Sequence, residues 1–328
     1  MKQLLQRTFT RLSDHLSLAH LRLWPERPAL LVFAFHVLFP DEQALGQHLV
    51  DPQQHTTAAM LEQLVAYFLA HGYTFVTPKQ VVRGLDPAGR YAWLTFDDGY
   101  YNNRLALPIL KRYGVPATFF IASHYVLANQ AFWWDVVYRH RRQQPLTPAA
   151  QQAEYALLKQ LPYAEIDEYL RHHFGPNALR PIGNLDRPFT AAELWEFAQE
   201  PEVTLGNHTV HHAILTNYSP TTAAQELAAC QHDLAQLGGA APTAVAYPNG
   251  NYDPTVLTAA AAAGLGLGAT VEPGKNYLPL RKPLQIRRFM LWGNRSIERQ
   301  CALFRADFHL REQLRTWLQN TGLRTASV

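Results

Sequence analysis

The chain has 328 residues, of which 48% are hydrophobic and 17% are charged, enough apolar material for a core. This composition excludes a disordered or fibrous chain. Lysine plus arginine exceeds aspartate plus glutamate by 29 − 26 = +3, a net charge too small to indicate a nucleic-acid partner. The two cysteines, Cys230 and Cys301, are far apart in the sequence. We therefore expect reduced thiols, not a disulfide framework or a thiolate metal site.

Residues 1–28 predict a basic amphipathic helix, with Leu4, Phe9 and Leu12 on one side and Arg7 on another. Two interpretations stay open: a helix packed on the body, or peripheral contact with an anionic membrane surface. The segment lacks the apolar core and cleavage site of a secretory signal. No apolar run in the chain reaches the roughly 18 residues of a membrane span. We expect a cytoplasmic location, with membrane association through this helix as the alternative.

From residue 29 onward, strand and helix signals alternate. A parallel sheet follows, because parallel neighbours need crossover connections. We predict an α/β fold, a distorted (β/α)7–8 barrel over residues 29–295, with a helical insertion at about 126–190 and a C-terminal helical segment at 296–328. The expected strands are residues 29–35, 74–76, 91–96, 117–121, 204–207, 244–247, 267–271 and 284–288. The expected helices are residues 57–70, 103–113, 219–239, 253–264 and 296–318.

The first chemical motif is Thr95-Phe96-Asp97-Asp98-Gly99, where an apolar strand ends and glycine permits a sharp turn. The C-terminal strand ends of a barrel form the rim of its active site. Adjacent carboxylates repel each other, so a cation or a proton must compensate them. Taken alone, the motif is also compatible with an ordinary turn in which an aspartate caps a helix.

The second motif is His208-Thr209-Val210-His211-His212, again directly after a predicted strand. Residues four apart can lie on the same side of a helical turn, which favours His208 with His212. This preference is weak, and His211 stays open as the second histidine. Two histidines with one carboxylate form a common ligand set for a catalytic divalent metal. A histidine-rich surface loop is the alternative.

The third motif is Tyr247-Pro248-Asn249-Gly250, at the end of another predicted strand. Pro-Asn-Gly is typical of a turn. A backbone N–H near Asn249 is a candidate for stabilising a developing oxyanion. A plain turn between a strand and a helix is the other interpretation.

Together the three motifs resemble the polysaccharide deacetylases of the NodB-homology group, carbohydrate esterase family 4. The resemblance covers about residues 29–290 and implies a distorted barrel that removes acetyl groups from N-acetylated sugars. It implies that Asp97 is the general base and that Asp98, His208 and His212 hold the metal. Zn(II) is the first expectation, and Co, Ni, Fe or Mn also suits such ligands. The implied partner is an N-acetylated glycan: a polysaccharide, an oligosaccharide or a lipid-linked sugar.

The chain departs from the family pattern at three places. The third motif usually begins with an arginine that orients the base, and here this position is Ala246. We expect Arg288, at the end of the last predicted strand, to replace it. Asn249 stands where the family usually has an aromatic residue. The late histidine segment that supplies the general acid is not evident, but His36 ends the first strand and resembles the early histidine of rearranged, exopolysaccharide-deacetylase-like members.

Four further residues are candidates for substrate binding: Tyr247 and Pro248 in the third motif, and Trp133 and Trp134 in the insertion. The tryptophans are either sugar-stacking platforms or part of a core, and aromatic side chains more often pack in cores. Two other functions stay open: a deacetylase-like protein that binds glycans without turnover, and a metal-dependent amidase on another small substrate. The oligomeric state is not indicated by the sequence.

Overall fold

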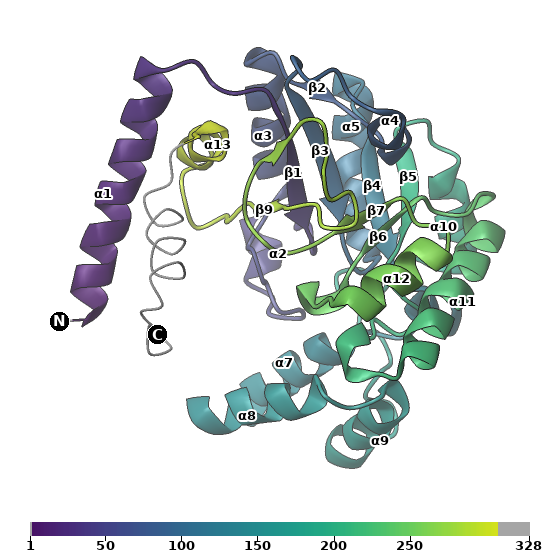
Figure 1. The fold of residues 1–328 in the computed structure, drawn as a ribbon. Coiled ribbons are helices and arrows are strands. Elements are labelled where there is room, and N and C mark those ends of the chain that lie inside the picture. The colour runs from purple at the N-terminus through teal and green to yellow at the C-terminus, as the bar shows by residue number, and fades with distance from the viewer. Residues whose placement is uncertain (1, 308–328) are drawn as a thin grey trace.

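The computed structural model describes residues 2–307, with side chains from residue 13 onward. A curled, mostly parallel sheet lies at its centre (Figure 1). Its order is β7-β6-β5-β4-β3-β1-β8, with β2 paired to β3 and β9 paired to β1. The strands are β1 (Ala29–Phe35), β2 (Thr74–Phe75), β3 (Tyr91–Phe96), β4 (Ala117–Ile121), β5 (Val203–Asn207), β6 (Ala244–Ala246), β7 (Leu267–Ala269), β8 (Asn276–Tyr277) and β9 (Phe289–Met290).

One late segment closes the barrel between its first and last parallel strands. Ile286 forms a parallel bridge with Ala269 of β7, and Phe289 then pairs with Phe33 of β1. The predicted strand at 284–288 is therefore a single bridge followed by the short strand β9. The predicted α/β barrel is confirmed, and its distortion comes from this irregular closure.

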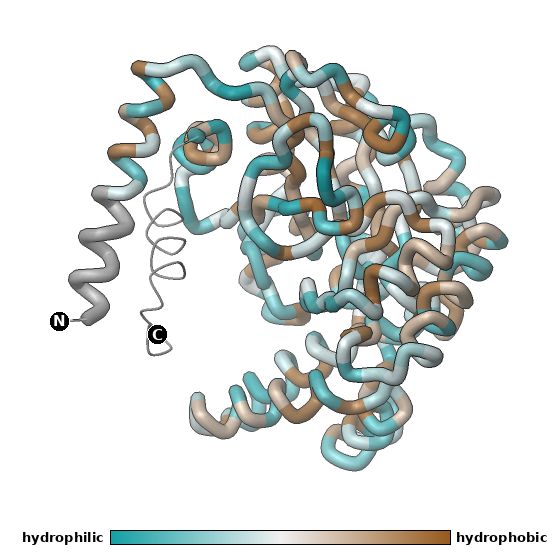
Figure 2. The backbone as a smooth tube through the Cα atoms, viewed as in Figure 1, coloured by the Kyte–Doolittle hydropathy of each residue, from teal (hydrophilic) through white to brown (hydrophobic). Residues whose placement is uncertain are grey.

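The strands are apolar on both faces because both faces are covered. Within β1, Leu30 and Val32 belong to the cluster that fills the barrel. Leu31, Phe33 and Phe35 belong to the cluster beneath the surrounding helices. This explains the continuous apolar runs in the sequence, where a half-exposed strand would alternate. In Figure 2, hydrophobic stretches run through the barrel, whereas the insertion helices alternate hydrophobic and hydrophilic residues.

The helices around the barrel begin at recognisable caps. Ser219 accepts a hydrogen bond from the N–H of Thr222, and Asp253 accepts one from Val256, in each case with proline in the first turn. The predicted helix at 103–113 begins as a 3-10 turn, η1 (Tyr101–Ala106). The helices of the barrel are α2 (Glu42–Leu45), α3 (Ala58–Ala70), α4 (Pro78–Arg83), α5 (Leu107–Tyr113), α6 (Ser123–Ala128), α10 (Ala191–Ala198), α11 (Pro220–Gly238) and α12 (Pro254–Ala262). Two further 3-10 turns are η2 (Leu215–Asn217) and η3 (Pro248–Gly250).

The stretch predicted as an insertion contains α7 (Trp133–Gln143), α8 (Pro148–Leu158) and α9 (Tyr163–Phe174). These helices lie below the barrel in Figure 1, at the end toward which the parallel strands run. They share a separate hydrophobic cluster that includes Phe132, Val136 and Leu170. The insertion is thus a second packed layer over the strand ends.

The N-terminal segment forms one long helix, α1 (Lys2–Leu23), beside α13 (Ile297–Arg305). Ser17 of α1 is buried, and Arg299 of α13 donates to Asp14 at 3.4 Å. This end of α1 therefore packs on the body, while membrane contact stays a prediction. Among the described residues, no helix combines the length and hydropathy that a membrane crossing requires. The predicted helical segment beyond residue 307 lies outside the described residues.

Candidate active site

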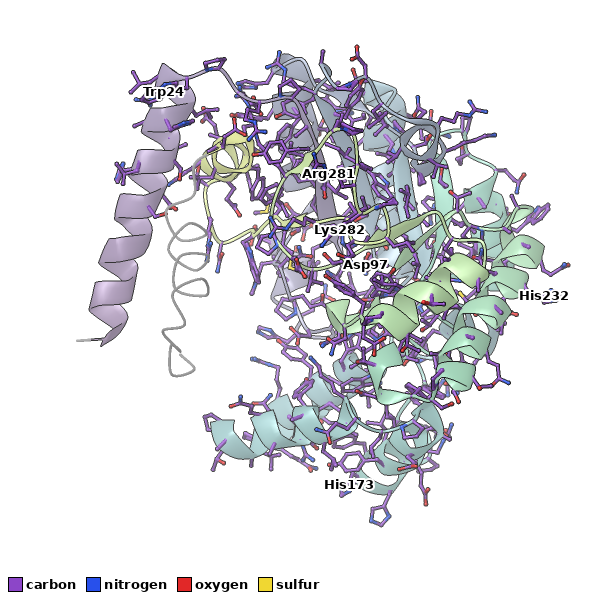
Figure 3. The ribbon with its side chains drawn as sticks, viewed as in Figure 1. Trp24, Asp97, His173, His232, Arg281 and Lys282 are labelled. Atoms are coloured by element: carbon purple, nitrogen blue, oxygen red, sulfur yellow. The ribbon has the colours of Figure 1, made fainter. Side chains whose placement is uncertain are left out.

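Three parallel strands deliver polar side chains to one edge of the sheet. β1 is followed by His36, β3 by Asp97 and Asp98, and β5 by His208. Figure 3 shows Asp97 inside the molecule, between the strand ends and the overlying elements. A cavity of about 300 Å³ opens at this edge. The barrel contributes His36, Asp98, His212 and Asn249 to its wall, and the insertion contributes Trp133, Trp134, Tyr155, Leu158, Lys159, Tyr163 and others.

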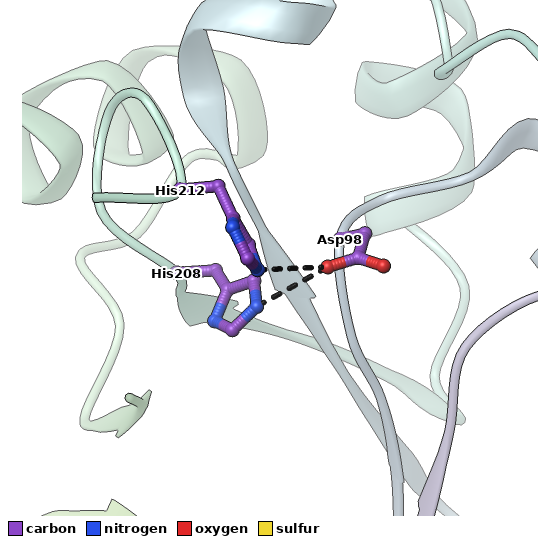
Figure 4. A group of neighbouring side chains, drawn as sticks. All are labelled: Asp98, His208 and His212. Carbon is purple, nitrogen blue, oxygen red and sulfur yellow. Dashed lines mark ion pairs between the residues drawn. The ribbon is translucent and has the colours of Figure 1, made fainter. Parts of the chain in front are cut away.

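Asp98, His208 and His212 form a compact group (Figure 4). The Oδ1 atom of Asp98 lies 3.3 Å from Nε2 of His208 and 3.4 Å from Nε2 of His212. This oxygen is buried and has no hydrogen-bond partner among the described residues. Metal–ligand distances of about 2.0–2.2 Å at a tetrahedral angle separate ligand atoms by about 3.3–3.6 Å. The three residues therefore fit a divalent metal, which would also satisfy the unpartnered oxygen.

The turn after β3 aims both carboxylates inward. Neighbouring residues of a strand point to opposite faces, but Asp98 has a left-handed backbone with φ of 76° and Gly99 follows with φ of 94°. A Cβ on Gly99 would also meet Ile121 at 3.1 Å. Such strained conformations persist where the surroundings over-determine them. Glycine is therefore required for the turn that brings Asp97 and Asp98 to the same site.

The two ligand histidines differ in their electrostatics. The Nδ1 of His208 donates to the carbonyl oxygen of Ala246 at 2.7 Å, which leaves Nε2 toward Asp98. Burial lowers the pKa of His208, but the nearby carboxylates of Asp98 and Asp97 outweigh burial, so this pKa is raised. Burial, helped by His208, lowers the pKa of His212 to about 3. His212 is thus neutral near pH 7, as a metal-ligating imidazole must be.

His211 points away from the metal group. Its Nδ1 lies 2.7 Å from Oε1 of Glu226 on α11, and its backbone N–H donates to Oε2 of the same carboxylate. This geometry favours His212 over His211 as the second candidate ligand, a choice that spacing left open, because a carboxylate of α11 holds His211.

Arg288 forms a two-pronged ion pair with Asp97. Its Nη1 and Nη2 donate to Oδ1 and Oδ2 of Asp97 at 2.7 and 2.8 Å, and its Nε donates to the carbonyl of Thr270. Burial alone would raise the pKa of Asp97, but the Arg288 guanidinium outweighs burial and holds this pKa well below its usual range. Arg288 lies in the barrel-closing segment, directly before β9, so this segment brings an arginine to Asp97 although position 246 is an alanine.

His36 lies beside Asp97 at the end of β1. Its Nε2 lies 3.9 Å from Oδ2 of Asp97, and its Nδ1 lies 2.9 Å from Oε1 of Gln54. The amide nitrogen of Gln54 donates to the carbonyl of Ala34, so its oxygen remains to accept from Nδ1 of His36. Nε2 is thus the nitrogen directed at the site. The sequence analysis missed Gln54, because nothing in the local pattern connects it with His36.

Two residues of the third motif are buried in the core, and Asn249 lies at the rim of the cavity. Tyr247 and Pro248 are buried, and the Tyr247 hydroxyl donates to the carbonyl of Leu284 at 3.0 Å. Neither residue lines the cavity, which corrects the expectation that their side chains bind substrate. Asn249 does reach the cavity rim, with φ of 57°, and its Oδ1 accepts from Nζ of Lys159 at 2.8 Å. The oxyanion role near Asn249 stays a prediction.

Trp133 and Trp134 line the cavity but are only 5% and 8% exposed. The Trp134 ring packs on Phe132 at 5.1 Å and on His212 at 4.6 Å between centroids. These neighbours favour the core-packing alternative for Trp134 over sugar stacking. Trp133 meets Tyr155 at 6.0 Å and presents only a small surface to the cavity. Core packing thus dominates at both positions.

Comparisons with known proteins agree with this site. The family model described as polysaccharide deacetylase matches residues 84–268, which include Asp97, Asp98, His208 and His212 but not His36 or Arg288. YxkH of Bacillus subtilis (strain 168), named as a polysaccharide deacetylase by assignment alone, is 24% identical over 209 residues. The match spans 62% of this chain and only 54% of YxkH.

Solved structures share the fold. The deacetylase PplD of Streptococcus pyogenes, determined with acetate, has 19% identity and a TM-score of 0.58, over 85% of this chain and 99% of that one. IcaB from Ammonifex degensii has 16% identity and a TM-score of 0.57, over 86% and 99% of the two chains. The family model spans more than half of the protein and contains the paired aspartates and both ligand histidines. The chain belongs to the polysaccharide deacetylase family.

Proposed function

We propose that the protein is a metal-dependent hydrolase that removes acetyl groups from N-acetylated sugars and releases acetate and a free amino sugar. One observation carries the proposal: a buried Asp98 faces two histidines beside an Asp97 that is clamped by Arg288. Membership of the polysaccharide deacetylase family supports the same reaction. The structure of the deacetylase PplD was determined in complex with acetate, the acid that the proposed reaction would release here.

The metal would be held by Asp98, His208 and His212. When bound, a divalent metal polarises an amide carbonyl and lowers the pKa of water. The ligand set of two imidazoles and one carboxylate is common for catalytic zinc, so Zn(II) is the first metal to test. Co, Ni, Fe and Mn suit the same donors.

Asp97 is proposed as the general base. Its lowered pKa keeps the carboxylate ionised at neutral pH, so it is ready to accept the proton of the attacking water. The two hydrogen bonds from Arg288 fix the plane of the carboxylate. A fixed base lowers the entropic cost of reaching the reactive geometry.

His36 is proposed as the general acid that protonates the leaving amine. Gln54 holds the Nδ1 side of the ring, so that a protonated Nε2 faces the cavity beside Asp97. The base and the acid thus flank the reacting amide from two neighbouring strands, β3 and β1.

The substrate is proposed to be a glycan whose N-acetyl group enters the cavity between barrel and insertion. A polysaccharide, an oligosaccharide and a lipid-linked sugar are all candidates. The insertion wall offers Tyr155, Leu158 and Tyr163 to the apolar faces of a sugar or its acetyl methyl group. Comparing N-acetyl sugars of increasing length and a lipid-linked form would rank these classes.

The first experiment measures metal content and acetate release together, for the wild type, Asp97→Asn and Asp98→Asn. We expect Asp97→Asn to keep its metal and lose acetate release, and the adjacent Asp98→Asn to lose both. A wild type that binds metal and glycan without turnover would support the glycan-binding alternative. Release of acid from small amides but from no N-acetyl sugar would support the amidase alternative.

A further inference from the structure

The two ligand histidines are held in place by different means. His208 is fixed by its hydrogen bond to the Ala246 carbonyl. For His212, we find no hydrogen-bond partner at Nδ1 within residues 2–307. Its ring instead packs against the indole of Trp134, with centroids 4.6 Å apart. The orientation of His212 therefore depends on whatever fixes Trp134.

A buried hydrogen-bond chain fixes Trp134. Its Nε1–H donates to the hydroxyl oxygen of Tyr100 at 2.7 Å, and this hydroxyl donates to Oδ2 of Asp135 at 2.7 Å. The other oxygen of Asp135 accepts from the backbone N–H of Asp51 at 2.8 Å. Tyr100 and Asp135 are fully buried. A satisfied network in a dry interior is rigid, so the indole has one defined position.

The chain joins the segments that carry the metal ligands. Tyr100 lies two residues after Asp98, in the turn that follows β3. Trp134 and Asp135 open helix α7 of the insertion, and Trp134 touches His212 in the loop after β5. The separation between Asp98 and His212 is thus set partly by the insertion.

We propose that Tyr100, Trp134 and Asp135 are positioning residues that hold His212 for metal binding. This inference rests on the metal site of the proposed function. Outer partners of metal ligands change metal affinity by about 10–100-fold when they are mutated. Here the outer partner is an indole face, and its hydrogen-bond chain makes the insertion a functional part of the metal site.

Two variants keep an aromatic ring in place and remove hydrogen bonds of the buried chain. Tyr100→Phe removes the acceptor of the Trp134 N–H and the donor to Asp135. Trp134→Phe keeps a ring beside His212 and removes the N–H that fixes it. The matched control is Asp186→Asn, which affects an equally buried carboxylate of the insertion. Asp186 pairs with Arg139 at 2.7 Å and belongs to no contact with the metal ligands.

The test titrates metal-free protein with cobalt(II) and records affinity, by competition with a chelator, and the visible absorption band. We expect about 10–100-fold weaker binding and a changed band for Tyr100→Phe and Trp134→Phe. Asp186→Asn should lower thermal stability and leave affinity and spectrum unchanged. Unchanged affinity in both aromatic variants overturns the inference, as does an equal loss in Asp186→Asn or a wild type that binds no cobalt. A wild type that binds cobalt but deacetylates no sugar ends the proposed function and leaves the inference intact.

Discussion

The two walls of the cavity are built in different ways. The barrel side carries the candidate metal ligands and the Asp97–Arg288 pair, and backbone carbonyls fix several of these groups, as Ala246 fixes His208 and Thr270 fixes Arg288. The insertion wall is mostly aromatic and aliphatic, and side-chain packing fixes it. The chemistry therefore depends on backbone geometry, whereas the shape of the cavity depends on three helices that the barrel itself does not require. Changes to the barrel wall should lower the rate, and changes to the insertion wall away from Trp134 should weaken substrate binding.

The largest expected effect is that of His36→Gln. Loss of a general acid lowers kcat by about 10²–10⁴-fold. Metal content should not change, because His36 belongs to none of the contacts within the metal group. The control is His211→Gln, since His211 also lines the cavity but pairs with Glu226. A similar loss of kcat in both variants would show that neither histidine has a specific role in proton transfer.

The next largest effect is that of Arg288→Met. It leaves Asp97 buried without its cation, which should lower the free energy of unfolding by about 3–5 kcal/mol. The lowered pKa of Asp97 stabilises the wild type above the unfolded value of about 3.9, and this contribution is lost as the pH falls. The stability gap between wild type and variant should therefore shrink below about pH 4. The acid limb of the pH–rate profile should move to higher pH, because the pKa of Asp97 rises without Arg288.

Arg139→Met is the matched control for Arg288→Met. Arg139 pairs with the buried Asp186 at 2.7 Å, the same separation as in the pair of Arg288 with Asp97. The Arg139→Met variant should lose a similar free energy of unfolding, as measured by urea denaturation. Its pH–rate profile should be the same as that of the wild type. A shifted profile in this control would mean that global loosening, not the pKa of Asp97, sets the acid limb.

A smaller effect is expected on the insertion wall, from Tyr155→Leu. Tyr155 is partly buried and lines the cavity from α8. Losing an aromatic contact worth about 0.5–1.5 kcal/mol should raise KM by about 2–12-fold and leave kcat and metal content unchanged. Tyr169→Leu, on α9 with its hydroxyl bonded to Glu154, is the control away from the cavity. A fall in kcat for Tyr155→Leu would contradict the view that the insertion wall affects substrate binding and not the rate.

The positions of most barrel-side candidates could be predicted from the sequence, because covalent neighbours and strand ends define them. Asp98, His208 and His212 follow strands that must end at one edge, and Arg288 was predictable once Ala246 was seen to lack a guanidinium. The closure by Ile286 and Phe289 was only roughly predicted, since two short pairings with different strands do not produce a regular strand pattern.

The side-chain contacts of the insertion wall could not be predicted from the sequence, because they join residues that are far apart in the chain. Tyr100, Asp135 and Asp51 meet only when α7 docks on the barrel, and no spacing connects them. Sugar stacking and core packing both stayed open for Trp134, because its aromatic type is visible in the sequence while its contacts with Phe132 and His212 are not. Tyr247 was misjudged for the same reason: its burial depends on Leu284, in the distant closing segment.

The smallest expected effect concerns a carboxylate of the barrel that is structural. Glu193 accepts from the N–H of Thr190 at 2.9 Å and pairs with Arg187, in the capping box of α10. The hydrogen bond with Arg187, against the effect of burial, lowers the pKa of Glu193 to about 2. Glu193→Gln keeps an acceptor for the cap and removes the charge. Because the pair is partly exposed and screened, we expect a loss of at most about 1 kcal/mol near neutral pH and unchanged acetate release.

The pH dependence of this last effect identifies its physical cause. A lowered pKa contributes stability that is present above the unfolded value of about 4.3 and disappears as the pH falls toward 2. The difference in unfolding free energy between wild type and Glu193→Gln should therefore vanish near pH 2, and 1 M salt should reduce it at pH 7. If the difference in unfolding free energy persisted at low pH, its cause would be the geometry of the helix cap and not the charge of Glu193. Any loss of acetate release would show that the Arg187 pair also supports the turn after β3, where the neighbouring Pro188 bridges to Tyr100.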